Sequence, residues 1–418
     1  MKRIYLRLFS YLVLLIVVSV SVYGQSYRTF GSELAEIEQN ARWRFGPFRI
    51  YASAQFRNVG YDNNIYQMSK EDDPIGDYTT TVSLPFTFYL PYRNWMIAYL
   101  DISPGYDFYL HEKQQNGLNY SYSPGVRFLF LNRFVLSGSH QQQKQKQRPT
   151  VEFDERIYVE SDGYNASLFY ETARMTAIGF TGSVRNIRYE DIEGDFSYST
   201  ALNHEQSTGN IEFYYRIFTE SDFFLTAGYA DYIFENPESQ WRDSYSYEVI
   251  SGIRFPLLGR ARGILSLGYR WLVNKADQKS RFSGLIGDTR LDFRLNRFNL
   301  RFQFARDFQF SYQSTSLYFI GNRIGSGLSF YLTEFIRLDY DFSYGKTEYN
   351  EELIQSPDGG FEENIRMDTY LTHSAGLVFR IKRNIGIGLT ATYWERDSNI
   401  LGVRRTRGFI GGYLTYDF

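Results

Sequence analysis

The last ten residues of the chain alternate strictly between two sets of side chains, and this period of two constrains the fold most. Ile410, Leu414 and Phe418 belong to one set, whereas Tyr413 and Asp417 belong to the other. Successive side chains of a β-strand point to opposite faces, so the alternation predicts a terminal strand. The same period runs through residues 48–57 and recurs along the chain. We therefore expect an all-β protein.

The predicted strands are joined by connections that alternate between short and long. The short connections are 91–94, 131–133, 172–174, 219–222, 256–259, 296–297, 333–334 and 382–384, and the long polar ones are 62–76, 111–117, 144–161, 190–202, 235–244, 275–281, 307–315, 346–366 and 397–404. Transmembrane barrels have short periplasmic turns and longer extracellular loops. The pattern predicts a transmembrane antiparallel up-and-down β-barrel of about 18 strands, with 16 as the alternative. A soluble sandwich or propeller, the competing interpretation, would not alternate so regularly.

Both ends of the chain carry features of export to a bacterial outer membrane. Tyr416 and the terminal Phe418 resemble the membrane-sorting signature of outer-membrane barrels. Residues 1–24 combine a basic start with an apolar run at 8–22, which predicts a signal peptide. A transmembrane anchor is the alternative, but the run is shorter than the roughly 20 residues that a spanning helix needs. We expect 25–46 to be a periplasmic lead-in, with a short helix capped by Ser32, and 47–418 to be the barrel.

The composition fits a barrel and excludes some partners. Aromatic residues make up 19% of the chain, with 37 Tyr and 36 Phe, and Cys is absent. The mean hydropathy is −0.39 and no second long apolar run exists. A net charge of −2 argues against nucleic acid. The expected partners are outer-membrane lipid and lipopolysaccharide, the barrel-assembly machinery and an acidic polysaccharide.

In a barrel the apolar face of each strand meets lipid and the other face lines the lumen. By this parity the pore-lining residues are Arg49, Arg57, Arg127, Arg185, Arg216, Arg254, Arg262, Arg270, Arg290, Arg294, Arg301, Arg337, Arg405 and Arg407. Fewer acids share that face: Glu212, Glu248, Asp288, Asp292, Asp339, Asp341 and Asp368. Because arginine rings select anions in pores, the excess predicts an anion-selective lumen. The alternative is that these arginines pair with lumen acids and only stiffen the wall.

The sequence gives no support for enzyme chemistry. It contains four His residues, of which only His204 falls on lumen parity, and no G-x-S-x-G elbow. No Cys/His cluster has the spacing of metal ligands. We therefore expect no catalytic residues, no metal and no cofactor. An outer-membrane hydrolase that uses His204 is the least supported hypothesis.

The segment from Val59 to Tyr66, Val-Gly-Tyr-Asp-Asn-Asn-Ile-Tyr, closes the first predicted strand. In a barrel of this length, it resembles the putative β-barrel porin type 2 family. That resemblance implies an association with exopolysaccharide production and export. The arginine-rich lumen also resembles that of alginate-export-type porins, which pass an acidic polysaccharide. The expected function is an outer-membrane porin-like channel for anionic solutes or an acidic exopolysaccharide. The alternative is a non-transporting surface protein whose loops 144–161 and 346–366 bind polysaccharide or a partner.

Overall fold

The computed structural model describes residues 29–418 except 151, 153–154, 173–175, 192–196, 219–220, 258–260, 278–280, 312–315, 350–352, 356–360, 364–365, 383 and 400–403. The predicted signal peptide, 1–24, lies outside the described residues. The helices are α2 (Phe30–Asn40) and α3 (Tyr198–Leu202), with 3-10 turns η1 (Lys70–Asp72), η2 (Lys113–Gln115) and η3 (Pro237–Arg242). In the described part of the chain, no helix is long and apolar enough to cross a membrane.

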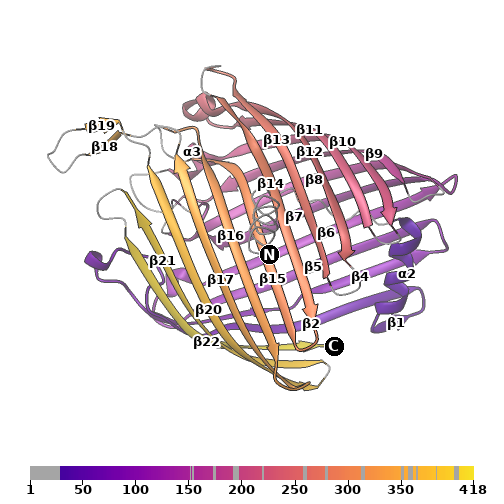
Figure 1. Cartoon of the computed structure of the whole chain (residues 1–418), viewed down its shortest axis with the longest axis horizontal. Coiled ribbons are helices and arrows are strands. Elements are labelled where there is room, and N and C mark those ends of the chain that lie inside the picture. Colours follow the sequence, from indigo (N-terminus) through magenta and orange to yellow (C-terminus); the bar gives the residue numbers. More distant parts are fainter. Residues whose placement is uncertain are drawn as a thin grey trace, which may run out of the picture.

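The strands occupy most of the described chain (Figure 1). They are β1 (Trp43–Phe45), β2 (Phe48–Asp62), β3 (Asp77–Ser83), β4 (Phe86–Tyr92), β5 (Met96–Tyr109), β6 (Gly117–Phe130), β7 (Phe134–Gln147), β8 (Ile157–Glu171), β9 (Ala177–Tyr189), β10 (His204–Phe218), β11 (Ser221–Phe234), β12 (Ser244–Leu257), β13 (Ala261–Asn274), β14 (Arg281–Leu295), β15 (Phe298–Phe310), β16 (Tyr318–Tyr331), β17 (Ile336–Tyr349), β18 (Leu353–Gln355), β19 (Phe361–Glu363), β20 (Met367–Lys382), β21 (Ile385–Ser398) and β22 (Arg405–Asp417).

The sheet closes on itself as an antiparallel barrel. The last strand, β22, pairs with β2, with Ser53 opposite Asp417 and Asp62 opposite Phe409. Strands β3 and β4 together make one spanning strand, because β2 and β5 each pair with both. The break falls at Leu84 and Pro85, and proline cannot donate a ladder hydrogen bond. With β1 as a short extra strand on β2 and β18–β19 as a separate pair, 18 strands span the barrel. The prediction of 18 strands is confirmed.

Side chains alternate between the two faces as the period of two predicts. On β12 and β13 the outward residues Val249 and Trp271 are 45% and 42% exposed, whereas the inward Ser266 is buried. A bulge at residues 57–58 interrupts the alternation on β2, where Asn58 has a φ of 52° and the register against β22 shifts. Beyond this bulge Val59 and Tyr61 are exposed and Asp62 is buried. The bulge therefore turns an acid into the barrel at the end of the first strand.

One part of the inner wall is apolar, whereas the alternation of side chains predicts that the polar face of each strand lines the lumen. The inward residues Ile250, Leu272 and Ile286 are fully buried, and Phe282 and Phe308 join them in one cluster. Leu317, from the connection between β15 and β16, belongs to the same cluster. The outer face of these strands therefore meets the membrane. Their inner face is covered by side chains of neighbouring strands and by loop residues. Apolar side chains therefore cover part of the inner wall along β11 to β16.

Helix α2 packs against the inner wall at the end of the barrel that carries the short turns (Figure 1). The expected helix is present, but Thr29 rather than Ser32 is its N-cap, accepting a hydrogen bond from the Ser32 amide. Phe30 is 1% exposed and belongs to the same buried cluster as Ile97 and Val135. In outer-membrane barrels this end is periplasmic. The helix therefore covers part of the inner wall at the periplasmic mouth.

Candidate functional site

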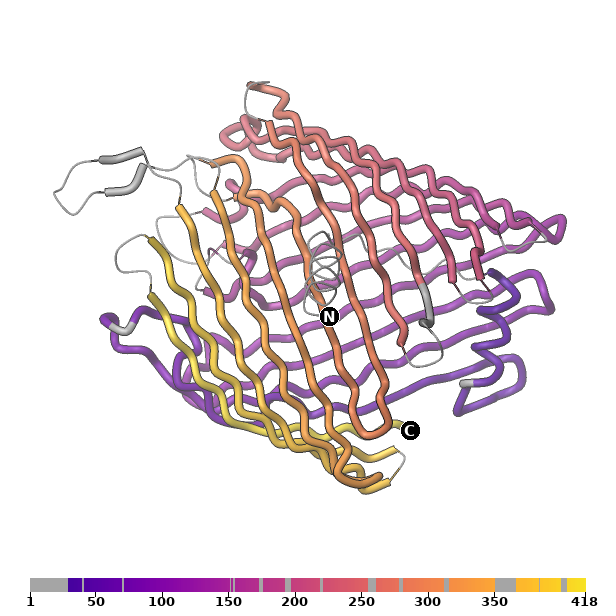
Figure 2. The backbone as a smooth tube through the Cα atoms, viewed as in Figure 1, coloured from indigo at the N-terminus to yellow at the C-terminus, as the bar shows by residue number. Residues whose placement is uncertain are grey.

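A cavity of about 1030 Å³ lies inside the barrel along the inner faces of β4 to β12. Hydroxyl and amide side chains predominate in its wall: Ser121, Ser123, Ser137, Ser139, Ser167, Ser183, Thr181, Thr208, Thr226, Gln141, Gln143, Asn165 and Asn210. The tube drawing in Figure 2 shows these strands as the magenta and purple wall that faces the orange and yellow one. Side chains of this kind exchange hydrogen bonds with water and with hydroxylated solutes. The cavity is therefore a polar compartment within the membrane-spanning part of the chain.

Three of the predicted pore-lining arginines, Arg127, Arg185 and Arg254, lie in the wall of this cavity. Arg127 forms an ion pair with Glu33 of helix α2, so its charge is partly neutralised. Arg185 is exposed, and within the described residues it forms no ion pair. The acids in the same wall are Glu33, Asp101, Glu212 and Glu248. The cavity therefore has a mixed charge, with Arg185 as its accessible cation.

Most of the other predicted arginines form ion pairs. The pairs are Arg49–Glu38, Arg216–Asp222, Arg270–Glu248, Arg270–Asp307, Arg290–Asp288, Arg301–Asp341, Arg337–Asp339 and Arg407–Asp62. Arg57, Arg262 and Arg294 are exposed and make no ion pair with the described residues, and Arg405 is half-buried at a bridge with Ser69. Several partners, including Glu33, Glu38, Asp62, Asp222 and Asp307, are absent from the acids that parity assigns to the lumen. These extra acids offset much of the positive excess that the sequence predicts.

In the connection between β7 and β8, the described residues Arg148, Glu152 and Arg156 lie inside the barrel. The predicted extracellular loop, 144–161, is too long at both ends. Residues 144–147 continue β7, and 157–161 begin β8. Glu152 is 5% exposed, and its carboxylate accepts a hydrogen bond of 2.7 Å from the Ser311 hydroxyl. Ser311 follows β15, which lies nearly opposite β7 and β8 in the circuit of 18 strands. The described residues of this connection, 148–150, 152, 155 and 156, which we term the crossing loop, therefore reach across the lumen.

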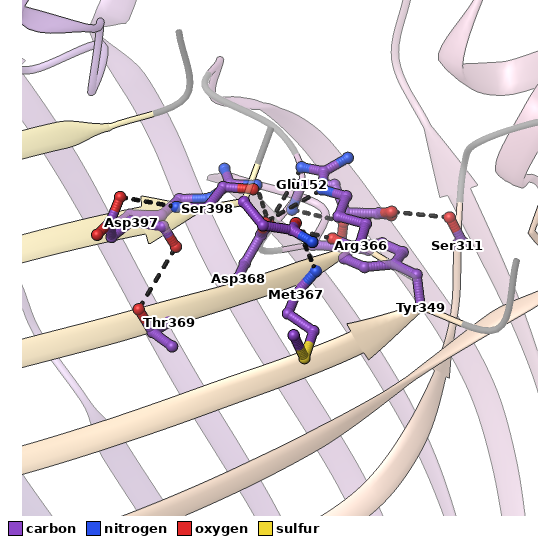
Figure 3. Close-up of polar contacts among 12 residues, drawn as sticks. Glu152, Ser311, Tyr349, Arg366, Met367, Asp368, Thr369, Asp397 and Ser398 are labelled. Atoms are coloured by element: carbon purple, nitrogen blue, oxygen red, sulfur yellow. Dashed lines mark hydrogen bonds and ion pairs between the residues drawn. The ribbon is translucent and has the colours of Figure 1, made fainter. Parts of the chain in front are cut away.

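Glu152, in the middle of the crossing loop, lies among buried charged groups (Figure 3). Asp368 is fully buried and accepts hydrogen bonds from Arg366 at 3.1 Å and from Arg396 at 2.6 Å. Arg242, on η3, donates at 2.8 Å to the Ser311 carbonyl. Burial lowers the pKa of Arg242 to about 10, and the nearby Glu152 carboxylate opposes this shift. These contacts fasten the loop at the mouth of the barrel that carries the long connections.

Sequence reasoning could find only part of this cluster. Asp368 is among the lumen acids predicted by parity, and Arg396 falls on the same inward parity of β21 as Thr392 and Trp394. Applying the same alternation to β21 therefore predicts that Arg396 also points into the barrel. Glu152 and Arg242 lie in connections, where no local period indicates which way a side chain points.

His204 packs among aromatic rings instead of facing the large cavity. Its ring is stacked 5.2 Å from the Phe234 ring and lies 6.3 Å from the Phe310 ring, and it is absent from the cavity lining. Among the residues that the structure describes, no group of three His, Cys, Asp or Glu side chains is arranged to hold a metal ion.

The closed barrel of 18 strands, with its lipid-facing apolar girdle and polar interior, defines an outer-membrane β-barrel of the porin kind. The chain belongs to the family described as "Putative beta-barrel porin 2", whose model matches residues 41–411. This match confirms the family resemblance and the bacterial outer-membrane location.

Solved structures share the barrel architecture at low sequence identity. OccAB3 of Acinetobacter baumannii has a TM-score of 0.51 and 11% identity, covering 88% of this chain and 99% of that chain. OpdK of Pseudomonas aeruginosa, solved with vanillate, has a TM-score of 0.52 and 9% identity, covering 88% and 98% of the respective chains. At such identities the likeness concerns the fold alone. The comparison with curated proteins gives no significant match.

Proposed function

We propose that this barrel is an outer-membrane channel for polar, anionic solutes, namely an acidic exopolysaccharide or its fragments. The observation that carries the proposal is the large cavity, whose wall combines hydroxyl and amide side chains with the exposed guanidinium of Arg185. Sugar hydroxyls can exchange hydrogen bonds with such a wall all along its length. Tyr89 and Tyr99 add aromatic rings to the same surface. These groups suit a saccharide chain better than an apolar solute.

The charge of the lumen sets the strength of the expected selectivity. The wall of the large cavity holds four acids and three arginines, so the concentration of anions by a charged surface is expected only close to Arg185. Most of the other predicted arginines are paired with acids, as described above, and paired charges attract a solute weakly. We therefore expect moderate anion preference, concentrated at a few arginines, rather than a uniformly positive pore. Arg270 is a poor probe of this property, because its guanidinium is already held between Glu248 and Asp307.

Refolded protein in planar bilayers tests the proposal through its reversal potential in a potassium chloride gradient. The unmodified channel should prefer chloride, and Arg185→Gln should shift the reversal potential toward that of potassium. Arg188→Gln is the matched control, because Arg188 lies on the same strand with its side chain 62% exposed and outside the cavity lining. A closed barrel, or a cation-selective one that Arg185→Gln leaves unchanged, would contradict the proposal.

The alternative function, polysaccharide binding by projecting loops, loses one of its two supports. The crossing loop is folded inward and fastened at Ser311, so it does not form an outward binding surface. Of the second segment, 346–366, several residues lie outside the described part of the chain. No contact in the described residues favours this function over a channel.

A further inference from the structure

A second cavity, of about 430 Å³, lies beneath the start and end of the crossing loop. Strands on both sides of the barrel seam contribute to it, because its lining includes Thr79 of β3 and Trp394 of β21. Arg148 and Arg156, from the two ends of the crossing loop, complete the wall. The linings of the two cavities share no residue. Any solute that passes the crossing loop on this side meets these residues.

Three guanidinium groups converge on this cavity, those of Arg148, Arg156 and Arg407, and the carboxylates of its lining are Asp62 and Asp107. Asp62 accepts a hydrogen bond of 2.7 Å from Arg407, and Asp107 forms an ion pair with Arg156. Arg148 donates a hydrogen bond of 2.8 Å to the Ile65 carbonyl. The lining therefore has more cations than anions. An anion placed among the three guanidinium groups would reduce their mutual repulsion.

The pKa of Arg148 is consistent with this excess of guanidinium groups over carboxylates. Burial, together with the positive charges of Arg407 and Arg156, lowers the pKa of Arg148 to about 9. Arginine otherwise keeps its proton at any physiological pH, so such a lowering reports an environment that disfavours a further positive charge. A carboxylate can bind a guanidinium through two parallel hydrogen bonds, which makes it a suitable anion for this position.

The rest of the lining is suited to a hydroxylated ring. Five threonines, Thr79, Thr80, Thr81, Thr372 and Thr392, belong to the lining, and Asn58 contributes an amide. The Trp394 ring lies in the same wall, and an aromatic face can cover the apolar face of a sugar ring. A small inorganic anion could accept hydrogen bonds from the arginines and the threonines but would make no use of the aromatic face of Trp394.

From this arrangement we infer that the second cavity is a binding site for a carboxylated sugar unit, with the carboxylate at Arg148 and Arg407 and the ring against Trp394. The inference rests on the proposed function, for which it names the solute class and a specificity subsite. The crossing loop supplies Arg148, so the loop that narrows the lumen also contributes to recognition.

Equilibrium binding to the detergent-solubilised full chain tests the site without requiring an open channel. The probe is a hexamer of galacturonic acid, titrated calorimetrically, with a neutral glucose hexamer of equal length as the comparison. The variants are Arg148→Gln and Trp394→Leu. Arg188→Gln serves as the control outside both cavities. We expect Arg148→Gln to weaken uronate binding about tenfold, as loss of one charge-assisted hydrogen bond does, and Trp394→Leu to weaken it through loss of the aromatic face.

The outcomes separate this inference from the proposed function. Uronate binding that is weakened by both variants, and unchanged by Arg188→Gln, supports the site. Unchanged uronate binding in correctly folded Arg148→Gln and Trp394→Leu overturns it, even where bilayer recordings show an anion-preferring channel. Equal affinity for the glucose hexamer overturns the assignment to a carboxylated sugar. A barrel that binds uronate through these residues but conducts no ions supports the site while refuting the channel.

Discussion

The carboxylate of Glu152 accepts a 2.7 Å hydrogen bond from the hydroxyl of Ser311, a residue 159 positions away. Glu152 lies in the crossing loop between β7 and β8, and Ser311 follows β15 on the opposing wall. Both residues are buried. This contact fastens a loop across the interior of a barrel that its strand number alone would leave open, because barrels of 16–18 strands can enclose a channel. The state of the pore therefore depends on contacts among connections.

Releasing this contact should open the lumen. Glu152→Ala removes a charged acceptor from a buried site, and a hydrogen bond to a charged group contributes about 1.5–3 kcal/mol. We expect a larger single-channel conductance and faster proteolysis within residues 148–156. Glu155→Ala is the matched control, because Glu155 is exposed in the same loop. Conductance equal to that of the unmodified protein would show that the loop stays in place without Glu152.

The buried Asp368 should contribute strongly to stability. Asp368→Asn leaves the guanidinium groups of Arg366 and Arg396 buried without their shared carboxylate, and breaking a buried ion pair costs about 3–5 kcal/mol. The lower free energy of unfolding should appear as a lower midpoint in urea, measured by tryptophan fluorescence in micelles. In the control, Asp341→Asn, the pair with Arg301 is about half exposed, so the loss should be at most about 1 kcal/mol. Equal effects of the two substitutions would contradict a special role for the buried cluster.

Helix α2 should detach from the inner wall when its anchoring ring is removed. Phe30→Ala deletes a side chain that is 1% exposed, and such truncations cost about 3–5 kcal/mol. Faster hydrogen exchange across residues 30–40 should follow, while exchange in the barrel strands should not change. Gln39→Ala, at an exposed position of the same helix, should leave exchange unaffected. Uniformly faster exchange throughout the barrel would instead indicate that the helix is needed for the whole fold.

The terminal phenylalanine should matter for assembly more than for the stability of the finished barrel. The Phe418 amide donates to the Ala52 carbonyl at 3.0 Å, and its ring contacts only the rings of Trp43 and Tyr416 at the barrel rim among the described aromatic pairs, with the residue 36% exposed. Phe418→Ala should therefore reduce the folded fraction recovered in outer membranes, measured by heat-modifiable gel mobility. The unfolding midpoint of the assembled protein should change little. Phe335→Ala, which removes another exposed aromatic ring near a short turn, should assemble normally.

The local alternation of side chains was sufficient to predict the barrel. Alternation in segments such as 245–253 and 265–271 predicts both the strands and the faces that meet lipid, and the structure has Val249 and Trp271 exposed. The alternating short and long connections predict the number of strands, which is confirmed. These properties are readable because a strand places successive side chains on opposite faces, whatever lies elsewhere in the chain. The bulge at Asn58 shows the limit, since one such irregularity reverses the parity of every later residue in the strand.

The candidate site depended on contacts that no local pattern contains. The alternation of side chains predicts that Arg407 lies on the inner face, but only the closed barrel places it against Asp62, 345 residues away. Likewise, Glu152 reaches Ser311 only because the crossing loop turns inward instead of outward. The sequence by itself thus determined the strands, their faces and the membrane that surrounds them. Tertiary structure decided which arginines are paired and which connection crosses the lumen, because ion pairing and loop packing depend on distances across the closed barrel.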